Sequence, residues 1–268
     1  MLSYQHGFHA GNKADVLKHA VLDALLRDLT AGKRSRFYVE THSGRGIYDL
    51  TGDQANKTGE AAEGVLEMLE GSRSPKPLRP WLDDVRADTA QAYRGSPAIA
   101  ARRLKPNDRL VLFERHPAEH AALSDALADD KRIRIQKADG YSGALKLQPR
   151  RGEDMIVLVD PSYETMRDMD ELAQWAPRAL NKWPNAVLIL WLPLFKDERE
   201  AEFGAFLSDL EDGVIAGARW APDLEKDTAL CGSAMVAYRV SDEAKNAATE
   251  IAAALQSYWS RGKRSSPI

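Results

Sequence analysis

One short apolar run that stops at an aspartate constrains the fold of this chain more than any other feature. Met155 to Val159 is an unbroken stretch of long and β-branched apolar residues, and Asp160 and Pro161 follow it directly. A run of this length that ends in Asp-Pro is typical of a buried central strand of a parallel sheet, entering a loop at its carboxyl end. Ligands bind at this edge of an open α/β sheet. We therefore expect Asp160 to lie at the mouth of a ligand-binding cleft.

Two other predicted strands also end at carboxylates. Arg109 to Glu114 ends in Glu114 itself, and Ile133 to Gln136 is followed by Asp139 and Gly140. An acidic residue at such a strand end commonly accepts hydrogen bonds from ribose hydroxyls, which is the role we expect for Glu114. The Asp139 side chain, an acceptor, and the adjacent backbone of Gly140 are placed where they could contact an adenine.

The first predicted strand, Arg36 to Thr41, runs into a glycine-bearing turn, His42 to Gly46. Such a turn lets the backbone approach a nucleotide-like cofactor without interference from Cβ atoms. Its spacing is shorter than the full dinucleotide fingerprint, so the turn alone does not specify the ligand.

The amino-terminal segment is rich in rings and precedes the first predicted helix. That helix begins after Asn12, a suitable N-cap, and runs to about Leu29, with Lys18 and His19 projecting together from an early turn. The residues before it follow neither a strand nor a helix period. We expect residues 1–11 to form a flap over an active site; its rings are Tyr4, His6, Phe8 and His9.

The remaining pattern predicts an α/β fold with a mostly parallel sheet, an antiparallel last strand and a small inserted helical subdomain at about residues 47–95. Ser96 is expected to be the N-cap of a helix, because Pro97 suits its first position. Later strands are expected at Val187 to Trp191, Val214 to Trp220 and Ala234 to Val240. Helices are expected at about Gly59 to Glu70, Trp81 to Tyr93, His116 to Asp129, Arg167 to Lys182 with a kink or break at Pro177, Asp197 to Leu210 and Asp242 to Trp259.

Composition excludes several classes of protein. The chain has 268 residues, 44% of them hydrophobic, enough for one large domain. With 37 basic and 40 acidic residues the net charge is −3, which argues against nonspecific coating of nucleic acid but allows a local basic face. The single cysteine, Cys231, excludes a disulfide within the chain and a cysteine-rich zinc site. The longest apolar run, Ala186 to Phe195, is too short for a bilayer, so we expect a cytoplasmic protein with no membrane contact.

The residues Asp160-Pro161-Ser162-Tyr163 resemble the Asp-Pro-Pro-Tyr signature of methyltransferases that act on exocyclic amino groups. The lone pair of adenine N6 is delocalised into the ring and is a poor nucleophile. Acceptors from Asp160 and the Pro161 carbonyl can draw this nitrogen toward a tetrahedral geometry, while the Tyr163 ring stacks on the base. The other interpretation is an ordinary strand terminator followed by a surface aromatic.

Taken together, these residues resemble the RlmJ family, bacterial S-adenosyl-L-methionine-dependent methyltransferases that modify adenine N6 in 23S ribosomal RNA. The resemblance is closest over residues 1–19. It implies a Rossmann-like class I methyltransferase domain spanning residues 1–268, in a protein that we expect to be a monomer. Beyond residues 1–19, the sequence resembles the family in the blocks Thr41 to Gly44, Thr58 to Glu60, Gly95 to Pro97, Glu114 to Pro117, Lys137 to Gly140 and Asp160 to Glu164.

The resemblance also implies roles for individual residues, with S-adenosyl-L-methionine as cofactor and no metal. Asp160, Pro161 and Tyr163 are the expected catalytic residues. The expected cofactor contacts are His19, His42, Ser96, Glu114, Asp139, Gly140 and Asp160. The expected contacts to the RNA are Tyr4, His6, Lys18 and Tyr163.

Two departures from the family pattern keep other functions open. Ser162 replaces the second proline of the signature, and Val240-Ser241 stands where a more proline-rich strand end is expected. One alternative is an amino methyltransferase that acts on DNA adenine or on a protein amide. Another is a nucleic-acid-binding protein that has lost catalysis through the change at Ser162.

Overall fold

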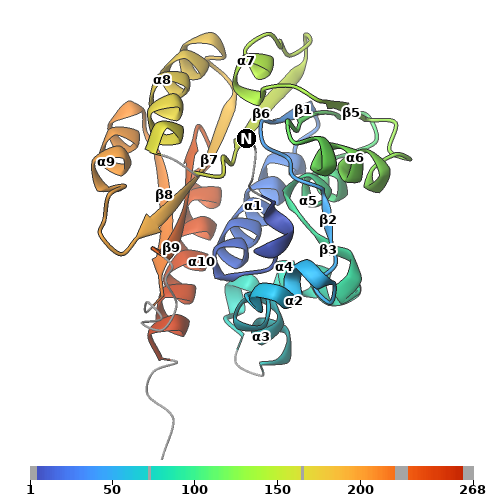
Figure 1. The fold of residues 1–268 in the computed structure, drawn as a ribbon. Helices are drawn as coiled ribbons and strands as arrows, with labels where there is room; N and C mark the ends of the chain where they lie inside the picture. The colour runs from blue at the N-terminus through green and yellow to red at the C-terminus, as the bar shows by residue number, and fades with distance from the viewer. Residues whose placement is uncertain (1–4, 72–73, 164–165, 221–228, 262–268) are drawn as a thin grey trace, which may run out of the picture.

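A seven-stranded sheet in the order β5-β4-β1-β6-β7-β9-β8 forms the centre of the computed structural model (Figure 1). The structure describes residues 5–71, 74–163, 166–220 and 229–261. Strands β5, β4, β1, β6 and β7 pair in parallel, whereas β9 pairs antiparallel with both β7 and β8. The predicted Rossmann-like sheet with an antiparallel last strand is therefore confirmed. The strands are β1 Ser35–Glu40, β4 Arg109–Phe113, β5 Ile133–Gln136, β6 Glu153–Val159, β7 Val187–Phe195, β8 Gly213–Arg219 and β9 Leu230–Tyr238.

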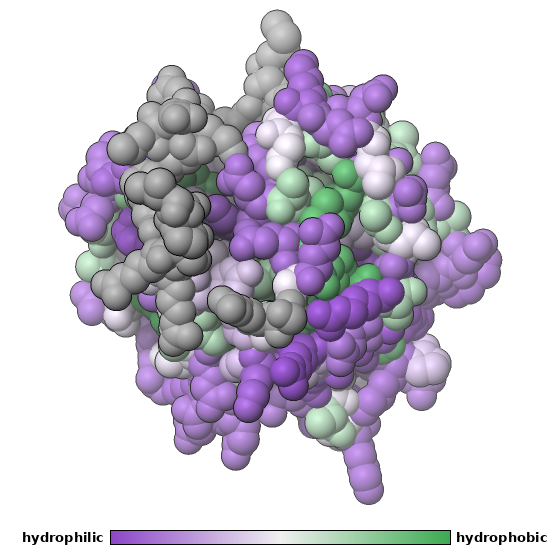
Figure 2. Space-filling view, turned by 90° about the horizontal axis from the view of Figure 1, so that it is seen from below, coloured by the Kyte–Doolittle hydropathy of each residue, from purple (hydrophilic) through white to green (hydrophobic). Residues whose placement is uncertain are grey.

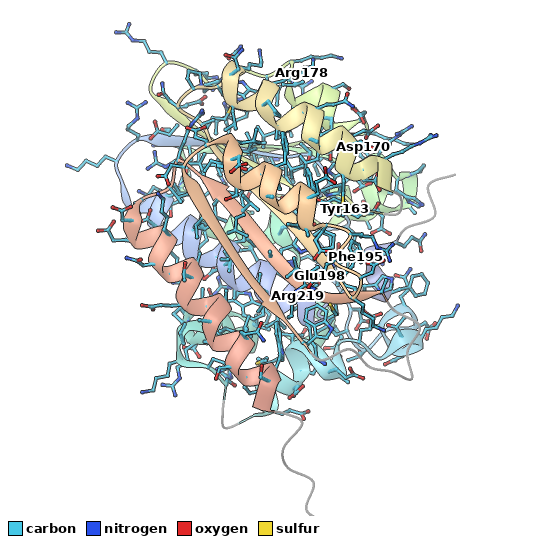
Figure 3. All side chains as sticks on the ribbon, turned by 90° about the vertical axis from the view of Figure 1, so that its left-hand side faces the viewer. Tyr163, Asp170, Arg178, Phe195, Glu198 and Arg219 are labelled. Carbon is cyan, nitrogen blue, oxygen red and sulfur yellow. The ribbon has the colours of Figure 1, made fainter. Side chains whose placement is uncertain are left out.

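Helices cover both faces of the sheet, because successive residues of a buried strand point to opposite sides. In β1, Tyr38 packs on the face that carries α1, α5, α6 and α10, whereas Phe37 and Val39 pack on the face that carries α7, α8 and α9. In Figure 3, α8 rises from beside Tyr163 past Asp170 to Arg178. The helices are α1 Lys13–Ala31, α5 Ser96–Arg103, α6 Pro117–Ala126, α7 Gly140–Ala144, α8 Met166–Lys182, α9 Ala201–Leu210 and α10 Asp242–Arg261.

The register of the central strands brings three predicted site segments to one edge. Glu40, the last residue of β1, pairs with Leu112 of β4 and with Leu158 of β6. The carboxyl ends of these strands are therefore level. Glu114 and Asp160, which follow β4 and β6, lie on either side of the turn after β1.

The insertion between β1 and α5 contains short helices and a small antiparallel ribbon, β2 Ile47–Tyr48 with β3 Tyr93–Arg94. The helix predicted at about Gly59 to Glu70 begins only at Ala62, because Gly59, with a φ of 67°, ends α2. It is also not a single helix, since Gly64 has non-helical backbone angles, with φ −110° and ψ −113°. Gly64 packs against the amino-terminal segment: a Cβ there would lie 2.1 Å from Gly11 O. The helical elements are α2 Asp53–Thr58, η2 Ala62–Leu66, α3 Glu67–Glu70, η3 Lys76–Leu78, α4 Arg79–Ala87 and η4 Ala90–Ala92.

Several predicted helix ends differ from the structure. Asn12 does cap α1, since its side chain accepts a hydrogen bond from Asp15 N. Ser96 is not a cap: Gly95 has that position, and Ser96 Oγ bonds Glu40 instead of the helix backbone. The helix predicted from Trp81 to Tyr93 ends at Ala87, and α9 begins at Ala201 rather than at Asp197.

The pattern around two prolines was also misleading. β7 continues past Trp191 through Pro193 to Phe195, because β9 pairs with it along this whole length. α8 runs without a break from Met166 to Lys182 although Pro177 lies inside it.

The helices in the described ranges are all too short or too polar to cross a bilayer. The face seen in Figure 2 is mainly hydrophilic, with its most strongly apolar surface near the middle and weaker apolar surface scattered toward the edges.

Candidate active site

A cavity of about 660 Å³ opens at the carboxyl edge of the sheet. Its wall combines residues that follow β1, β4, β5 and β6 with residues from α1 and β7. Every site residue predicted from the sequence lines this cavity except Tyr4, which lies outside the described residues. The lining residues among them are His6, Lys18, His19, His42, Ser96, Glu114, Asp139, Gly140, Asp160, Pro161 and Tyr163.

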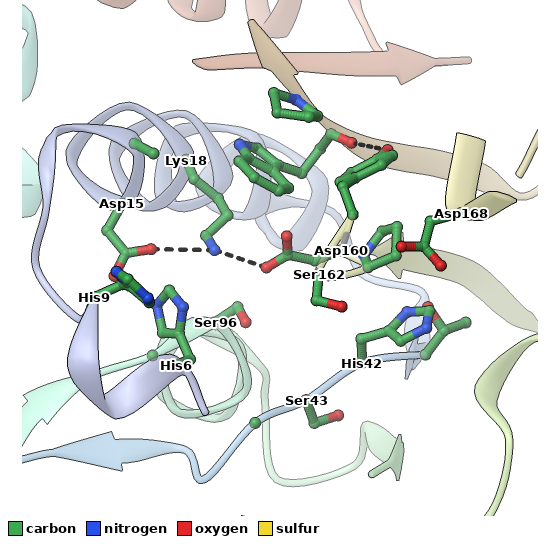
Figure 4. A pocket seen from close by; sticks show the side chains of 18 of the residues that line it. His6, His9, Asp15, Lys18, His42, Ser43, Ser96, Asp160, Ser162 and Asp168 are labelled. Atoms are coloured by element: carbon green, nitrogen blue, oxygen red, sulfur yellow. Dashed lines mark hydrogen bonds and ion pairs between the residues drawn. The ribbon is translucent and has the colours of Figure 1, made fainter. Parts of the chain in front are cut away.

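Asp160 forms an ion pair with Lys18 inside the cavity (Figure 4). Lys18 Nζ lies 2.7 Å from Asp160 Oδ2 and 3.1 Å from Asp15 Oδ1. Both Lys18 and Asp15 are buried. Because a carboxylate oxygen accepts more than one hydrogen bond, the pair with Lys18 orients Asp160 and still leaves it able to accept from a ligand.

Asp15 connects the amino-terminal segment to this pair. Its Oδ2 atom accepts hydrogen bonds from His6 Nε2 and from Gly11 N, each at 2.9 Å. Burial alone would raise the pKa of Asp15, but the charges of His6 and Lys18 and the hydrogen bond with His6 hold that pKa well below its usual range. Asp15 is therefore a carboxylate that fixes both the segment before α1 and the Lys18 ammonium.

His19 is a neutral imidazole in the cavity wall. Its Nδ1 atom lies 2.7 Å from Tyr93 OH, and the residue is buried. Burial lowers the pKa of His19 to about 3, against the opposing effect of Asp15. A neutral imidazole has one ring nitrogen that donates and one that accepts, so His19 can form hydrogen bonds with Tyr93 and with a ligand at the same time.

Glu114 is held in place by backbone groups on both sides. Its Oε1 atom accepts from His116 N at 2.7 Å, and its Oε2 atom accepts from Gly44 N at 2.8 Å. Burial raises the pKa of Glu114, an effect that these two hydrogen bonds oppose. Each oxygen keeps a lone pair, which is what a pair of ribose hydroxyls requires.

The turn after β5 packs directly against the turn after β1. Asp139 caps α7 by accepting from Ser142 N at 2.8 Å. At Gly140 there is no room for a side chain, since a Cβ atom would lie 1.9 Å from Thr41 O. His42 is fixed by a 2.8 Å contact with Thr41 Oγ1, and its ring meets the ring of Tyr141 edge to face.

Tyr163 closes the other side of the cavity. Its hydroxyl donates to Trp191 O at 2.7 Å, and the two ring centroids lie 5.4 Å apart. Lys18 Nζ lies 5.3 Å from the centroid of the Trp191 ring. In Figure 3, Phe195 lies below Tyr163; like Trp191, it lines the cavity. This wall offers aromatic surface next to Asp160.

Asp15 and Trp191 are cavity residues that the sequence interpretation did not identify. Asp15 lies within the predicted first helix, and its spacing of three from Lys18 places both on one helix face. Trp191 ends a predicted strand, and the strand pattern alone predicts no contact with a ligand. The described residues contain no group of three or more His, Cys, Asp or Glu side chains that could hold a metal ion.

The cavity suits S-adenosyl-L-methionine. Glu114 and Asp139 present acceptors on the side of β4 and β5, and the volume is in the range of small-molecule sites. Ser43 and Tyr141 line the wall, and their buried hydroxyl oxygens have no partner among the described residues, as expected where a polar ligand completes a site. The sheet order and this edge site together define a Rossmann-like S-adenosyl-L-methionine-dependent methyltransferase.

Comparison with known proteins places the chain within that class. Residues 33–260 match the family model described as ribosomal RNA large subunit methyltransferase D, RlmJ. The chain belongs to this family. It is 35% identical to ribosomal RNA large subunit methyltransferase J of Escherichia coli and 33% identical to that of Haemophilus influenzae; each match covers 72% of this chain and 71% of the relative.

A solved structure supports the same fold. A Legionella pneumophila protein is 27% identical and superposes with a TM-score of 0.84, over 95% of each chain.

Proposed function

We propose that this chain transfers the methyl group of S-adenosyl-L-methionine to N6 of an adenine in 23S ribosomal RNA. The observation that carries the proposal is the position of Asp160, at the end of β6, inside the cavity and beside the aromatic wall of Tyr163 and Trp191. Family membership and the names of the two bacterial relatives, ribosomal RNA large subunit methyltransferase J, support methyl transfer to large-subunit ribosomal RNA.

The cofactor contacts are proposed from the walls of the cavity. Glu114 accepts from the ribose hydroxyls, and Asp139 and Gly140 meet the adenine. His19, His42 and Ser96 complete the site. The bound cofactor supplies an electrophilic methyl group on a sulfonium, so the protein needs neither a nucleophile nor a metal for the transfer.

Asp160 and Pro161 are proposed to act on the target amine. The Asp160 carboxylate and the Pro161 carbonyl accept hydrogen bonds from the amino group and favour the tetrahedral nitrogen that attacks in line. This contribution is catalytic because the acceptors meet the geometry of the transition state better than that of the planar amine. Lys18 holds the carboxylate in place, and Tyr163 offers its ring to the base.

The amino-terminal segment is proposed to contact the RNA through Tyr4 and His6. His6 is bonded to Asp15, and His9 Nδ1 lies 2.8 Å from Glu60 Oε1 of the insertion. The segment thus connects the active site to the insertion, both of which we expect to touch RNA. We also propose that the protein acts in the cytoplasm as a monomer.

The test is transfer of a labelled methyl group to separate rRNA, DNA and protein fractions. We expect label only in the large-subunit rRNA, at N6 of adenine. Asp160→Ala should lower turnover by about 10²-fold or more while leaving cofactor affinity largely intact. Asp160→Asn should be milder, since its amide oxygen still accepts one hydrogen bond.

A matched control is Asp212→Ala, which removes a surface carboxylate paired with Lys245. It should leave turnover unchanged. Turnover by Asp160→Ala within a few-fold of wild type would exclude the proposed site. Label in duplex DNA or in protein would instead favour the other amino methyltransferases, and cofactor binding without transfer to any RNA would favour a degenerate binding protein.

A further inference from the structure

Glu40 is a buried acid beneath the cavity that the roles above do not use. It is the last residue of β1, it has 0% exposure, and it does not itself line the cavity. Two hydroxyls hold its carboxyl group: Tyr38 OH lies 2.9 Å from Oε2, and Ser96 Oγ lies 2.5 Å from Oε1. Ser96 does line the cavity, so it links Glu40 to a ligand bound there.

One proton decides the direction of the bond between Glu40 and Ser96. An ionised Glu40 only accepts, so Ser96 has to donate its single hydroxyl proton to Oε1 and can then only accept from a ligand. In a protonated Glu40, Oε2 still accepts from Tyr38, while the Oε1 hydroxyl donates to Ser96 Oγ. Ser96 then keeps its own proton for the cavity.

The surroundings of Glu40 favour the protonated form at neutral pH. Burial raises its pKa to about 8, against the hydroxyls of Ser96 and Tyr38, which lower it. Two charged groups also act on it: Asp160 on β6 raises the pKa of Glu40, and Lys18 on α1 lowers it. Both hydrogen bonds to the carboxyl come from neutral groups.

The order of the strands indicates which part of the cofactor lies at Ser96. Glu114 and Asp139 follow β4 and β5, on one side of β1, and Asp160 follows β6, on the other side. If the adenosine lies at Glu114 and Asp139 and the sulfonium lies at Asp160, the amino-acid part of the cofactor lies over the end of β1, beside the start of α5. Gly95 and Ser96 line the cavity there, and a helix N-terminus favours an anion. The cofactor carboxylate is such an anion, and it only accepts.

We propose that Glu40 is a positioning residue for the cofactor: its protonated carboxyl donates to Ser96 Oγ and leaves the Ser96 hydroxyl proton for the carboxylate of the cofactor's amino-acid part. Ionisation of Glu40 reverses the arrangement. Ser96 then turns a lone pair toward that carboxylate, and a second negative charge lies beneath it. This inference rests on the cofactor contacts proposed above.

The test is the affinity for S-adenosylhomocysteine, measured by calorimetry without RNA. For wild type, the affinity should fall about tenfold between about pH 6.5 and about pH 9.5 because of Glu40. Glu40→Gln carries an amide that donates to Ser96 and accepts from Tyr38 at every pH. It should bind like wild type at about pH 6.5 and should lack this fall. The amino group of the ligand titrates in both proteins, so its effect cancels in the comparison.

Three further measurements separate this role from a structural one. Ser96→Ala should bind weakly at both pH values. Methylthioadenosine has no carboxylate, so its affinity should be the same for wild type and Glu40→Gln at each pH. Tyr38→Phe removes a donor to Oε2 and should shift the wild-type fall to higher pH, which keeps the proposal testable if Glu40→Gln does not fold.

Superimposable pH profiles for wild type and Glu40→Gln would overturn the proposal. So would binding by Glu40→Gln that is as weak as that of Ser96→Ala at about pH 6.5, because that result would mean that an ionised Glu40 is required. A wild-type protein that does not bind S-adenosylhomocysteine at all would contradict the cofactor assignment itself, which distinguishes the two failures.

Discussion

Replacement of His19 by asparagine tests whether the cavity wall holds a neutral imidazole. His19 is 1% exposed, and its Nδ1 atom lies 2.7 Å from Tyr93 OH. Burial is the largest cause that lowers its pKa from 6.5 to about 3. An asparagine side chain places its amide oxygen near the position of Nδ1, so it keeps a partner for Tyr93 but does not titrate.

We expect His19→Asn to lose less stability than wild type when the pH is lowered. Below its pKa of 6.5 in the unfolded chain, and down to about 3, His19 binds a proton only when the chain is unfolded. The free energy of unfolding therefore falls as the pH falls through this window. Each pH unit corresponds to about 1.36 kcal/mol. Between about pH 7.5 and about pH 5, His19 should remove about 2 kcal/mol from wild type and nothing from His19→Asn.

The measurement is urea unfolding of both proteins at the two pH values. The difference between the two pH-dependent losses isolates His19, because every other titrating group is present in both chains. His120→Asn is the control, since His120 is on α6 and does not line the cavity; it should lose as much stability as wild type. Losses for wild type and His19→Asn that agree within about 0.5 kcal/mol would refute a buried neutral His19.

Two further predictions concern Glu114 and Ser162. Glu114→Ala should weaken the binding of S-adenosylhomocysteine by about 1.5 to 3 kcal/mol, the scale of a hydrogen bond to a charged group, and Glu114→Gln by less. Unchanged affinity in calorimetry would remove Glu114 from the cofactor site. Ser162→Pro should leave that affinity unchanged and leave turnover equal or several-fold higher, since a compatible proline contributes only about 0.4 to 1 kcal/mol. If wild type is inert on rRNA and Ser162→Pro restores methylation by orders of magnitude, the chain is a degenerate binding protein.

The sheet was predictable because each strand is encoded locally. Short apolar runs followed by Asp-Pro, by Glu or by a glycine turn identify both the strands and their carboxyl ends, and the parallel order then places those ends on one edge. The helix ends were less predictable, because a tertiary contact decided them. Ser96 has the sequence of an N-cap, but the buried Glu40 takes its hydroxyl.

The connections between cavity residues were not predictable from local pattern. Lys18 and Asp160 are separated by 142 positions, and His19 and Tyr93 by 74. No period or propensity links such pairs; only the packing of α1 across the carboxyl edge brings them together. The buried position of Glu40 was also not predictable, because a glutamate at a strand end is usually exposed.

The backbone of Tyr163 explains how the loop after β6 keeps its shape with a serine at position 162. Tyr163 has a φ of 49°, a conformation that costs a residue with a side chain about 1 to 2 kcal/mol. The hydrogen bond from its hydroxyl to Trp191 O and the contact of the two rings offset this cost. Trp191 is itself fixed, because its Nε1 atom donates to Ser233 Oγ on β9 at 2.9 Å.

The loop is thus held at both ends, by Asp160 through Lys18 and by Tyr163 through Trp191. A second proline would restrict Pro161 from within the loop. Here the contacts of Asp160 with Lys18 on α1 and of Tyr163 with Trp191 on β7 restrict residues 160–163 from outside the loop. Ser162 therefore has little conformational freedom to lose when the substrate binds, and its presence in place of proline is compatible with catalysis.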